Sequence, residues 1–476
     1  MSSEVSPAPV TMPAIERKVL TGWGRVAGTV ADVASPTTVD EVSALMASPG
    51  PRGVIPRGLG RAYGDAAQDS GGLVIDLTGL DSTLRVDHSS HQVTASTGHS
   101  LDHLMRVLVP QGYWVPVSPG TRNVSLGGAL AADVHGKNHH VDGSFGNAVR
   151  ELTLVAPGGD VRTLTPDGTP EEFWATVGGM GLTGAIVEAR FDAHPIETSR
   201  ASVDTERADN LDEALAMMSA SDDLYRYTVT WIDLMAKGAH LGRSVLTRGD
   251  FATLDQLPAK LRDDPLAYGP KVLAAAPPWA PPKLLNRATI GAFNEMWFRK
   301  APKVRRGEIQ SIPAFFHPLD MVSGWNRLYG HSGFIQYQFM LPFGAEETLR
   351  SIIGALSSAR VVSFLTVLKR FGLGNPGYLS FPKPGWTLAM DLPLGQEKLR
   401  ELLPRFDEQV VEAGGRHYFA KDSTISPRIV RAGYPCLDEW RVVRDRLDPD
   451  RVMASDLSRR LDLLGDSPAG SDRGTR

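Results

Sequence analysis

The sequence predicts an α+β protein with two domains, and three observations lead to this prediction. The chain has 476 residues, 42% of them apolar, whereas one hydrophobic core stops growing at roughly 250–300 residues. Up to about residue 198, short apolar runs alternate with glycine-rich turns. Beyond that point helical and strand-like segments mix without the regular alternation that builds a parallel sheet.

Several segments carry local signals that fix their type. The run at 100–112 has apolar residues at helical spacing behind a serine and ends at a glycine, and 210–220 is also helical. Two β-patterned runs around Pro-Gly-Gly predict a hairpin. Strands are predicted at 72–80, 91–98, 185–193, 333–342 and 385–393, the hairpin at 149–166, and a charged helical region at 414–464.

Composition excludes several classes of function. The net charge is −4 and the pI is near 6.3, so no nucleic-acid partner is expected. The single cysteine, Cys436, leaves no pair for a disulfide and no four-cysteine metal site.

Neither end of the chain nor its most apolar stretch predicts a membrane span. The first twenty residues lack the charged start and apolar core of a signal peptide. Residues 272–282 contain four prolines and are too short to cross a bilayer. We expect a cytoplasmic protein, or one that lies peripherally at the cell membrane or envelope.

The stretch PRGLGRAYGDAAQ, Pro56–Gln68, has three glycines within seven residues. Such a loop can turn several main-chain N–H groups toward an anion, although an ordinary surface turn has a similar composition.

A second glycine-rich run, GMGLTG at 179–184, matches the GxGxxG fingerprint of dinucleotide-binding folds. That fingerprint requires a following helix, whereas the next residues alternate like a strand. We therefore interpret these glycines as a tight turn.

The third glycine-rich stretch, Ser118–His140, reads SPGTRNVSLGGALAADVHGKNHH. A series of small residues where a core strand would carry Val or Leu indicates that a rigid ligand fills the space. Its three histidines lack a suitably spaced carboxylate or cysteine, so no metal site is expected.

PRGLGRAYGD, PGTRNVSLGGALAADVHG and WATVGGMGLTGAIVEARF occur in the order and at the spacing of the vanillyl-alcohol-oxidase-type FAD-binding superfamily, which this chain resembles. Within it the chain is most similar to the decaprenylphosphoryl-β-D-ribose 2′-oxidase family, through HGKNHH, FWATVGG, LTVLKRFG, YFAKDS and ASDLSRRLDLL. The resemblance runs from about Leu20 to Leu464.

This resemblance implies a two-subdomain FAD-binding domain with an inserted α+β substrate domain that contains an antiparallel sheet. The implied boundaries are 10–198 for the first part of the FAD domain, 199–413 for the substrate domain and 414–464 for the segment that returns to the FAD domain. Residues 465–476 have the composition of a disordered tail.

The resemblance also implies the cofactor and its contacts. FAD would be held by the main chain of the loop at 56–66, by the second loop, and by one residue each from a strand and the C-terminal segment. The implied set is Pro56, Arg57, Gly58, Leu59, Gly60, Arg61, Ala62, Tyr63, Gly64, Asp65, Ala66, Gly120, Ser125, Leu126, Gly127, Gly128, Ala132, Asp133, Val134, His135, Ile186 and Tyr418.

Related sugar-alcohol oxidases bond the flavin covalently to a histidine in the first loop. Arg61 stands at that position and cannot form the link, so a non-covalent cofactor is expected.

Oxidation of a secondary alcohol at a flavin requires a group that accepts the hydroxyl proton and a cation that stabilises the reduced ring. By resemblance, Lys421 is the expected cation. His135 is the expected base or the residue that orients one, with Tyr63 as the alternative base. His135 could equally do no more than hydrogen-bond the cofactor.

The substrate domain contains residues suited to a sugar phosphate. Strand alternation in IQYQF places two amides on one face, although a half-exposed polar face would look the same. We expect substrate contacts from Gln336, Gln338, Lys369, Lys137, Trp231, Phe371 and Ala389, the last at a position where members known as drug targets carry a cysteine.

Three functions follow as hypotheses. The first is FAD-dependent oxidation of the C2′ hydroxyl of a decaprenylphosphoryl-ribose, with a separate NADH-dependent keto-reductase completing an epimerisation for cell-wall arabinan. The second is an oxygen-dependent oxidase of an alditol or aldonolactone. The third is a binding protein that retains the fold without the chemistry.

Overall fold

The structure is a computed structural model that describes residues 12–277 and 285–465. Residues 10 and 11 of the expected first domain lie outside the described residues. So does the expected disordered tail from position 466 onward.

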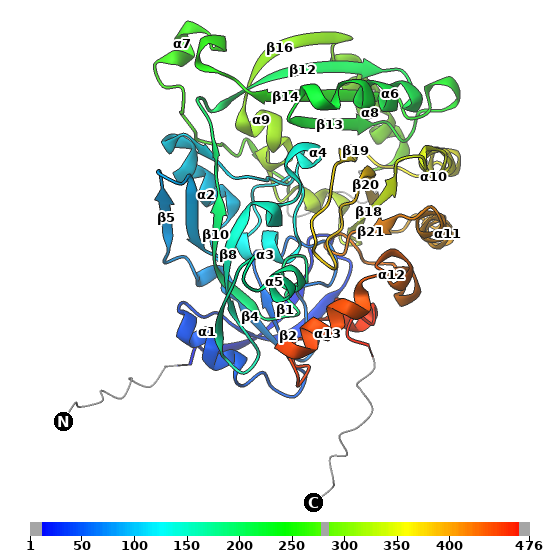
Figure 1. The fold of residues 1–476 in the computed structure, drawn as a ribbon. Helices are drawn as coiled ribbons and strands as arrows, with labels where there is room; N and C mark the ends of the chain where they lie inside the picture. Colours follow the sequence, from blue (N-terminus) through cyan, green and yellow to red (C-terminus); the bar gives the residue numbers. More distant parts are fainter. Residues whose placement is uncertain (1–11, 278–284, 466–476) are drawn as a thin grey trace, which may run out of the picture.

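The chain opens with a mixed four-stranded sheet of order β1-β2-β4-β3 (Figure 1). β1 and β2 are antiparallel, and the other neighbours are parallel. Thr38 and Glu41 form a capping box at the start of the helix that follows β2. The elements are β1 (Ile15–Thr21), β2 (Gly28–Ala34), α1 (Val39–Met46), β3 (Val54–Arg57) and β4 (Leu73–Asp76).

A second, five-stranded antiparallel sheet follows, in the order β5-β6-β10-β8-β9. The predicted hairpin is β8 and β9, and Gly158 and Gly159 adopt positive φ angles of 89° and 92° in its turn. The elements are β5 (Leu84–Asp87), β6 (Gln92–Ser96), β8 (Val149–Val155), β9 (Val161–Leu164), β10 (Ala185–Asp192), and a small pair, β7 (Tyr113–Trp114) with β11 (His194–Pro195).

Four helices accompany this sheet. The predicted helix at 100–112 is confirmed as α2, capped by Ser100 and followed by a short 3₁₀ turn that ends at Gly112, whose φ is 80°. The run at 179–184 leads into strand β10 and not into a helix, which confirms that it is no dinucleotide fingerprint. The helices are α2 (Leu101–Leu108), α3 (Leu126–Ala131), α4 (His139–Asp142) and α5 (Pro170–Thr176).

The third sheet is antiparallel and has eight strands in the order β16-β12-β14-β13-β19-β20-β18-β21. Its last strand lies three residues beyond the expected boundary at 413. Its strands are β12 (Arg200–Ala208), β13 (Tyr227–Ile232), β14 (Ser244–Phe251), β16 (Val304–Ser311), β18 (Phe334–Pro342), β19 (Thr366–Phe371), β20 (Gly385–Pro393) and β21 (Arg416–His417).

One face of this sheet packs against three amphipathic helices, α6 (Leu211–Ser221), α10 (Glu346–Ala359) and α11 (Leu399–Glu412), and their apolar residues form one core with the sheet (Figure 1). The opposite face of β18, β19 and β20 meets the glycine-rich loops. The remaining elements are α7 (Ala259–Arg262), β15 (Ala274–Ala275), α8 (Arg287–Lys300), α9 (Ile312–Phe316), β17 (Val322–Ser323) and the 3₁₀ helix η8 (Trp325–Tyr329).

After β21 the chain returns to the first sheet through α12 (Pro427–Gly433), α13 (Leu437–Leu447) and α14 (Asp456–Arg460). Trp440 on α13 is fully buried, and its indole N–H donates to the carbonyl of Ala175 at 3.0 Å. The first and last segments therefore lie at the same end of the molecule, coloured blue and red in Figure 1.

Candidate active site

The first glycine-rich loop, Pro56–Ala66, starts at the end of β3 and is closely packed on two sides. A Cβ atom on Gly58 would lie 1.9 Å from Ser125 Oγ, and one on Gly64 would lie 2.1 Å from the carbonyl oxygen of Asp422. Only glycine permits these approaches. The loop therefore touches both the second glycine-rich stretch and the C-terminal segment.

Five successive main-chain N–H groups of this loop, at residues 58–62, donate no hydrogen bond to any described residue. The next one, at Tyr63, donates to the carbonyl of Ala420 at 2.9 Å. A run of unpaired N–H groups in a glycine-rich turn is a nest for an anion. The loop thus fits the pyrophosphate of a dinucleotide cofactor.

The second stretch contributes the first turn of α3 and the segment that follows it. The Ser125 hydroxyl caps α3 by accepting from the Gly128 N–H at 3.2 Å. The Tyr418 hydroxyl donates to the carbonyl of Ala132 at 2.8 Å and so joins the C-terminal segment to this stretch. Ile186 is buried on β10, where its carbonyl accepts from Thr97.

Three expected cofactor residues have side chains that the protein itself engages. Asp133 accepts from Gly146, Asn375 and Ser380. Asp65 pairs with Arg460 at 2.8 Å, and Arg57 donates to two carbonyls. Any cofactor contact from these three residues would come from the main chain.

The expected catalytic residues come together where the loops meet the eight-stranded sheet. The Lys421 ammonium lies 4.0 Å from the centroid of the Tyr63 ring. The Tyr63 hydroxyl accepts from the Gln336 amide at 3.1 Å, and the Gln338 amide lies 2.9 Å from His135 Nε2. Four of these residues are buried: Tyr63, His135, Gln336 and Gln338.

A carboxylate that sequence reasoning missed completes this network. Asp391 on β20 is fully buried and accepts from the Gln336 amide at 2.5 Å and from the Tyr329 hydroxyl at 3.3 Å. Its signal in the sequence is an aspartate inside the apolar strand GWTLAMDLP. The pairing of Gln336 with Asp391 in the β18–β20 register puts both on one face.

Burial and mutual repulsion shift the pKa values of the basic groups downward. Burial lowers the pKa of Lys369 to about 8, and burial together with the Lys369 charge lowers that of Lys137 to about 7. Burial also holds the pKa of His135 well below its ordinary value.

Lys421 and Asp391 are coupled. Burial lowers the pKa of Lys421 against the opposing effect of Asp391, and burial raises the pKa of Asp391. A cluster of desolvated basic groups around one carboxylate is typical of an active site that stabilises negative charge.

Comparisons with known proteins agree with this geometry. The FAD binding domain family matches residues 30–165. Decaprenylphosphoryl-β-D-ribose oxidase of Mycolicibacterium smegmatis is 46% identical over 94% of this chain and 98% of its own.

The chain belongs to the decaprenylphosphoryl-β-D-ribose oxidase family. It carries an FAD-binding domain and is an FAD-dependent oxidoreductase of the class that acts on CH–OH groups. A protein of Streptomyces coelicolor from the mprA 5′ region is 37% identical over 76% of this chain and its own full length. L-gulono-1,4-lactone dehydrogenase of Mycobacterium tuberculosis is 22% identical over 90% of this chain and 95% of its own.

Most of the expected substrate residues in this family member lie on the polar face of the eight-stranded sheet. The β-register aligns Trp231 with Val367, Val367 with Ala389, and Ala389 with Gln338, so these side chains form one row. Lys369 pairs with Thr387 in the next row.

Two of the residues expected to contact the substrate, Lys137 and Phe371, contact other parts of the protein in the structure. The Lys137 ammonium donates to the carbonyl of Phe315 and lies 4.3 Å from that residue's ring, so this lysine is engaged by the protein. Phe371 packs edge-on against His135, with ring centroids 4.9 Å apart, and thereby helps to hold the histidine.

Within the described residues, no group of three or more His, Cys, Asp or Glu side chains is arranged to hold a metal ion. No helix in the same part of the chain combines the length and the hydropathy needed to cross a membrane.

Proposed function

We propose that this protein oxidises the C2′ hydroxyl of decaprenylphosphoryl-β-D-ribose to the 2′-ketone. The observation that carries the substrate assignment is the 46% identity to the Mycolicibacterium smegmatis oxidase over 98% of that protein's length. The buried polar face of the sheet supports the reaction class, because it offers amides for sugar hydroxyls and lysines for developing negative charge.

FAD would be held by the unpaired N–H groups of residues 58–62 and by the second glycine-rich stretch, and when bound it supplies the acceptor for the hydride from C2′. We propose that it is bound without a covalent link. Arg61 replaces the linking histidine, and its guanidinium stacks on Trp23 at 4.1 Å.

Lys421 is the proposed catalytic residue. Its lowered pKa makes a neutral amine accessible near neutral pH, so it can accept the hydroxyl proton. The resulting ammonium would offer a positive charge to a reduced flavin bound beside it. Proton acceptance thus creates the stabilising cation.

His135 is the proposed positioning residue. Its Nε2 faces the Gln338 amide, and burial keeps the ring neutral. The lone pair that a base would need is therefore engaged, which favours orientation of Gln338 over proton transfer. Burial raises the pKa of Tyr63 well above its ordinary value, so its hydroxyl stays protonated and is not available as a base.

The product of this reaction is a 2′-ketone on a lipid phosphate, so the proposed partner is an NADH-dependent keto-reductase that delivers hydride to the opposite face. Contact with a membrane surface is proposed as well. Val272 and Leu273 are 57% and 72% exposed, and apolar side chains so exposed suit an apolar partner.

Anaerobic bleaching of the flavin tests the proposed function. A prenylphosphoryl-β-D-ribose should bleach the flavin, whereas xylitol and gulonolactone at equal concentration should not. Faster bleaching by xylitol or the lactone would replace the proposal with an alditol or lactone oxidase. Purified protein without flavin absorbance, even after FAD is added, would leave only a binding role.

Acid precipitation tests whether the flavin is bound non-covalently. Acid precipitation should release the flavin into the supernatant, and a washed pellet should be colourless. A yellow pellet would show that another side chain forms the bond.

A further inference from the structure

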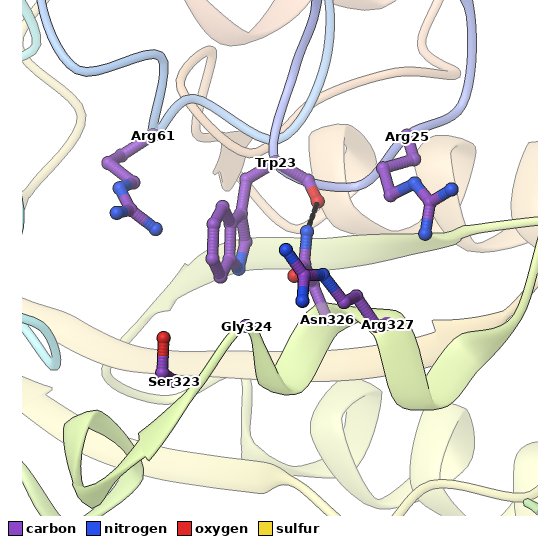
Figure 2. Close-up of a pocket in the computed structure, with 7 residues that line it drawn as sticks. All are labelled: Trp23, Arg25, Arg61, Ser323, Gly324, Asn326 and Arg327. Atoms are coloured by element: carbon purple, nitrogen blue, oxygen red, sulfur yellow. Dashed lines mark hydrogen bonds between the residues drawn. The ribbon is translucent and has the colours of Figure 1, made fainter. Parts of the chain in front are cut away.

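A cavity of about 380 Å³ lies beside the first glycine-rich loop and is lined by three arginines. Trp23 and Arg25 come from the turn between β1 and β2, and Arg61 comes from the loop itself. The remaining lining comes from β17 and η8. This arginine pocket, shown in Figure 2, consists of Trp23, Arg25, Arg61, Ser323, Gly324, Asn326 and Arg327.

The pocket is rigidly built. The Trp23 N–H donates to the carbonyl of Ala62 at 2.8 Å, which ties the turn to the first loop. The Asn326 amide donates to the carbonyl of Trp23 at 3.0 Å, which ties η8 to the same turn (Figure 2). Three segments that are distant in the sequence therefore fix the walls.

No counter-ion for the three guanidinium groups lies among the described residues. None of them makes a hydrogen bond or ion pair with any described residue, and Arg61 Nε is buried without an acceptor. By contrast, the fully buried Arg444 is paired with Asp448. Three unpaired cations around one cavity form a site for an anion, and planar guanidinium groups suit phosphate oxygens.

Asp320, whose carboxylate charge acts on Arg61, does not neutralise the pocket. The charge of Asp320 reaches Arg61, yet this carboxylate already accepts from the Thr121 hydroxyl at 2.7 Å and from the Arg122 N–H at 2.8 Å. The positive charge of the pocket is therefore free for a ligand.

The pocket adjoins the reaction centre, because the Gly24 N–H, in the turn that carries Trp23 and Arg25, donates to the carbonyl of Tyr63 at 3.0 Å, and packed aromatic rings line the same boundary. Trp23 packs against Trp325 at 5.8 Å, Trp325 against Phe334 at 5.6 Å, and Phe334 against Tyr63 at 5.5 Å between ring centroids. Tyr63 in turn contacts Lys421. In the proposed substrate the phosphate is attached to C1′, next to the carbon that is oxidised, so its binding site must adjoin the catalytic lysine.

Apolar residues border the pocket on the solvent side. β15 pairs in parallel with β17, and the N–H of Leu273 donates to the carbonyl of Met321 at 2.8 Å. This pairing aligns Ala275 with Ser323 of the pocket, and the exposed side chains of Val272 and Leu273 lie two to three residues earlier on the same segment, beside Met321. A chain leaving the pocket would meet an apolar surface.

We propose that the arginine pocket binds the phosphate of the lipid-linked substrate and that Val272 and Leu273 contact the first isoprene units. The assignment rests on the proposed function, whose substrate joins an anionic phosphate to a long apolar chain. It accounts for unpaired cations and exposed apolar residues on neighbouring segments.

Steady-state kinetics of the double variant Arg25→Gln/Arg327→Gln test the assignment, and Arg400→Gln is the matched control. Arg400 is exposed on α11 and its side chain makes no hydrogen bond or ion pair with the described residues. KM for farnesylphosphoryl-β-D-ribose should rise about tenfold to a hundredfold in the double variant, because charged hydrogen bonds are lost. KM for methyl β-D-ribofuranoside and the flavin content should match the parent.

An unchanged KM for the phosphorylated substrate, or an equal rise for both substrates, would overturn the assignment. Loss of flavin from the double variant would assign the pocket to the cofactor and overturn it as well.

Direct titration separates this inference from the proposed reaction. Farnesyl phosphate should bind the flavin-loaded parent more tightly than farnesol or inorganic phosphate, and the double variant should lose that preference. This result would uphold the pocket even if the ribose derivative were not oxidised. If the variant lost only its binding to phosphatidylglycerol vesicles and still bound farnesyl phosphate, the pocket would be a membrane headgroup site and the inference would be wrong.

Discussion

The two faces of strands β18 and β20 differ in composition and in what covers them. On one face Trp386, Leu388 and Met390 pack with the helices α10 and α11 in an apolar core. On the other, Gln336 and Asp391 are equally buried yet polar, beneath the glycine-rich loops. Burial alone does not distinguish the faces. What distinguishes them is that one is mainly a core of packed apolar side chains and the other a hydrogen-bonded network with lysines beside it.

The largest effect on stability should come from the apolar face. Leu388→Ala removes a fully buried side chain from the middle of β20 and should lower the free energy of unfolding by about 2–5 kcal/mol. Urea denaturation measures this loss, and turnover per bound flavin should stay near that of the parent. A stable variant with poor turnover would contradict the division between the faces.

Lys421→Ala should lower the reaction rate and leave the stability of the fold nearly unchanged. One preorganised charge is worth roughly 3 kcal/mol in the transition state, so the rate of flavin reduction should fall about a hundredfold while the variant stays folded and binds FAD. Stopped-flow reduction measures this rate. Lys398→Ala, at an exposed position, serves as control. Parental reduction in the Lys421 variant would mean that the role of this lysine is misassigned.

Lys369 should give the polar face a distinctive pH dependence. Its pKa falls from 10.5 to about 8 on folding, so between these values the unfolded chain holds more protons than the folded one. The free energy of unfolding should therefore rise with pH in this window, by up to about 1.4 kcal/mol per pH unit. Below the window both states hold the proton, so the full free-energy cost of burying the charged lysine is present.

Chemical denaturation of the parent and of Lys369→Met at pH 7 to 10 isolates this contribution. The variant should lack this part of the slope. Parallel curves would show that the lysine titrates alike in both states.

The smallest effect on stability is expected for Ala389→Cys, within about 1 kcal/mol, because the position is only partly buried. Its consequence is chemical. A nitroaromatic inhibitor whose nitro group has been converted to a nitroso group by the reduced flavin during turnover should add to this thiol. It should not add to the parent, whose single cysteine, Cys436, is exposed near α13. Intact-mass spectra after turnover report the adduct, and an adduct on the parent would refute the placement.

Local signals were enough to predict much of the fold. Ser100 and Gly112 bound a helix, and Pro-Gly-Gly at 157–159 makes a hairpin, because capping and positive φ depend on residues close in sequence. Strand alternation likewise placed Gln336 and Gln338 on one face and Tyr337 on the other, where its hydroxyl donates to Asp407. Such features need no knowledge of distant segments.

Asp391 and the arginine pocket could not be predicted from the sequence, because both depend on segments that are distant along the chain. Gln336 meets Asp391 only through the register of two strands about fifty residues apart in sequence, and that register is set by packing along the whole sheet.

The sequence by itself determined the family and the cofactor and singled out the lysine that is proposed as catalytic, because these features reside in short runs of residues with a definite order. The tertiary structure alone decided which charges stay unpaired. Arg61 could have paired with a nearby acid, yet the fold places Trp23 under it and Arg25 and Arg327 around the same cavity. Whether a buried charge is neutralised depends on what distant segments bring to it, and chain-local pattern carries no record of that.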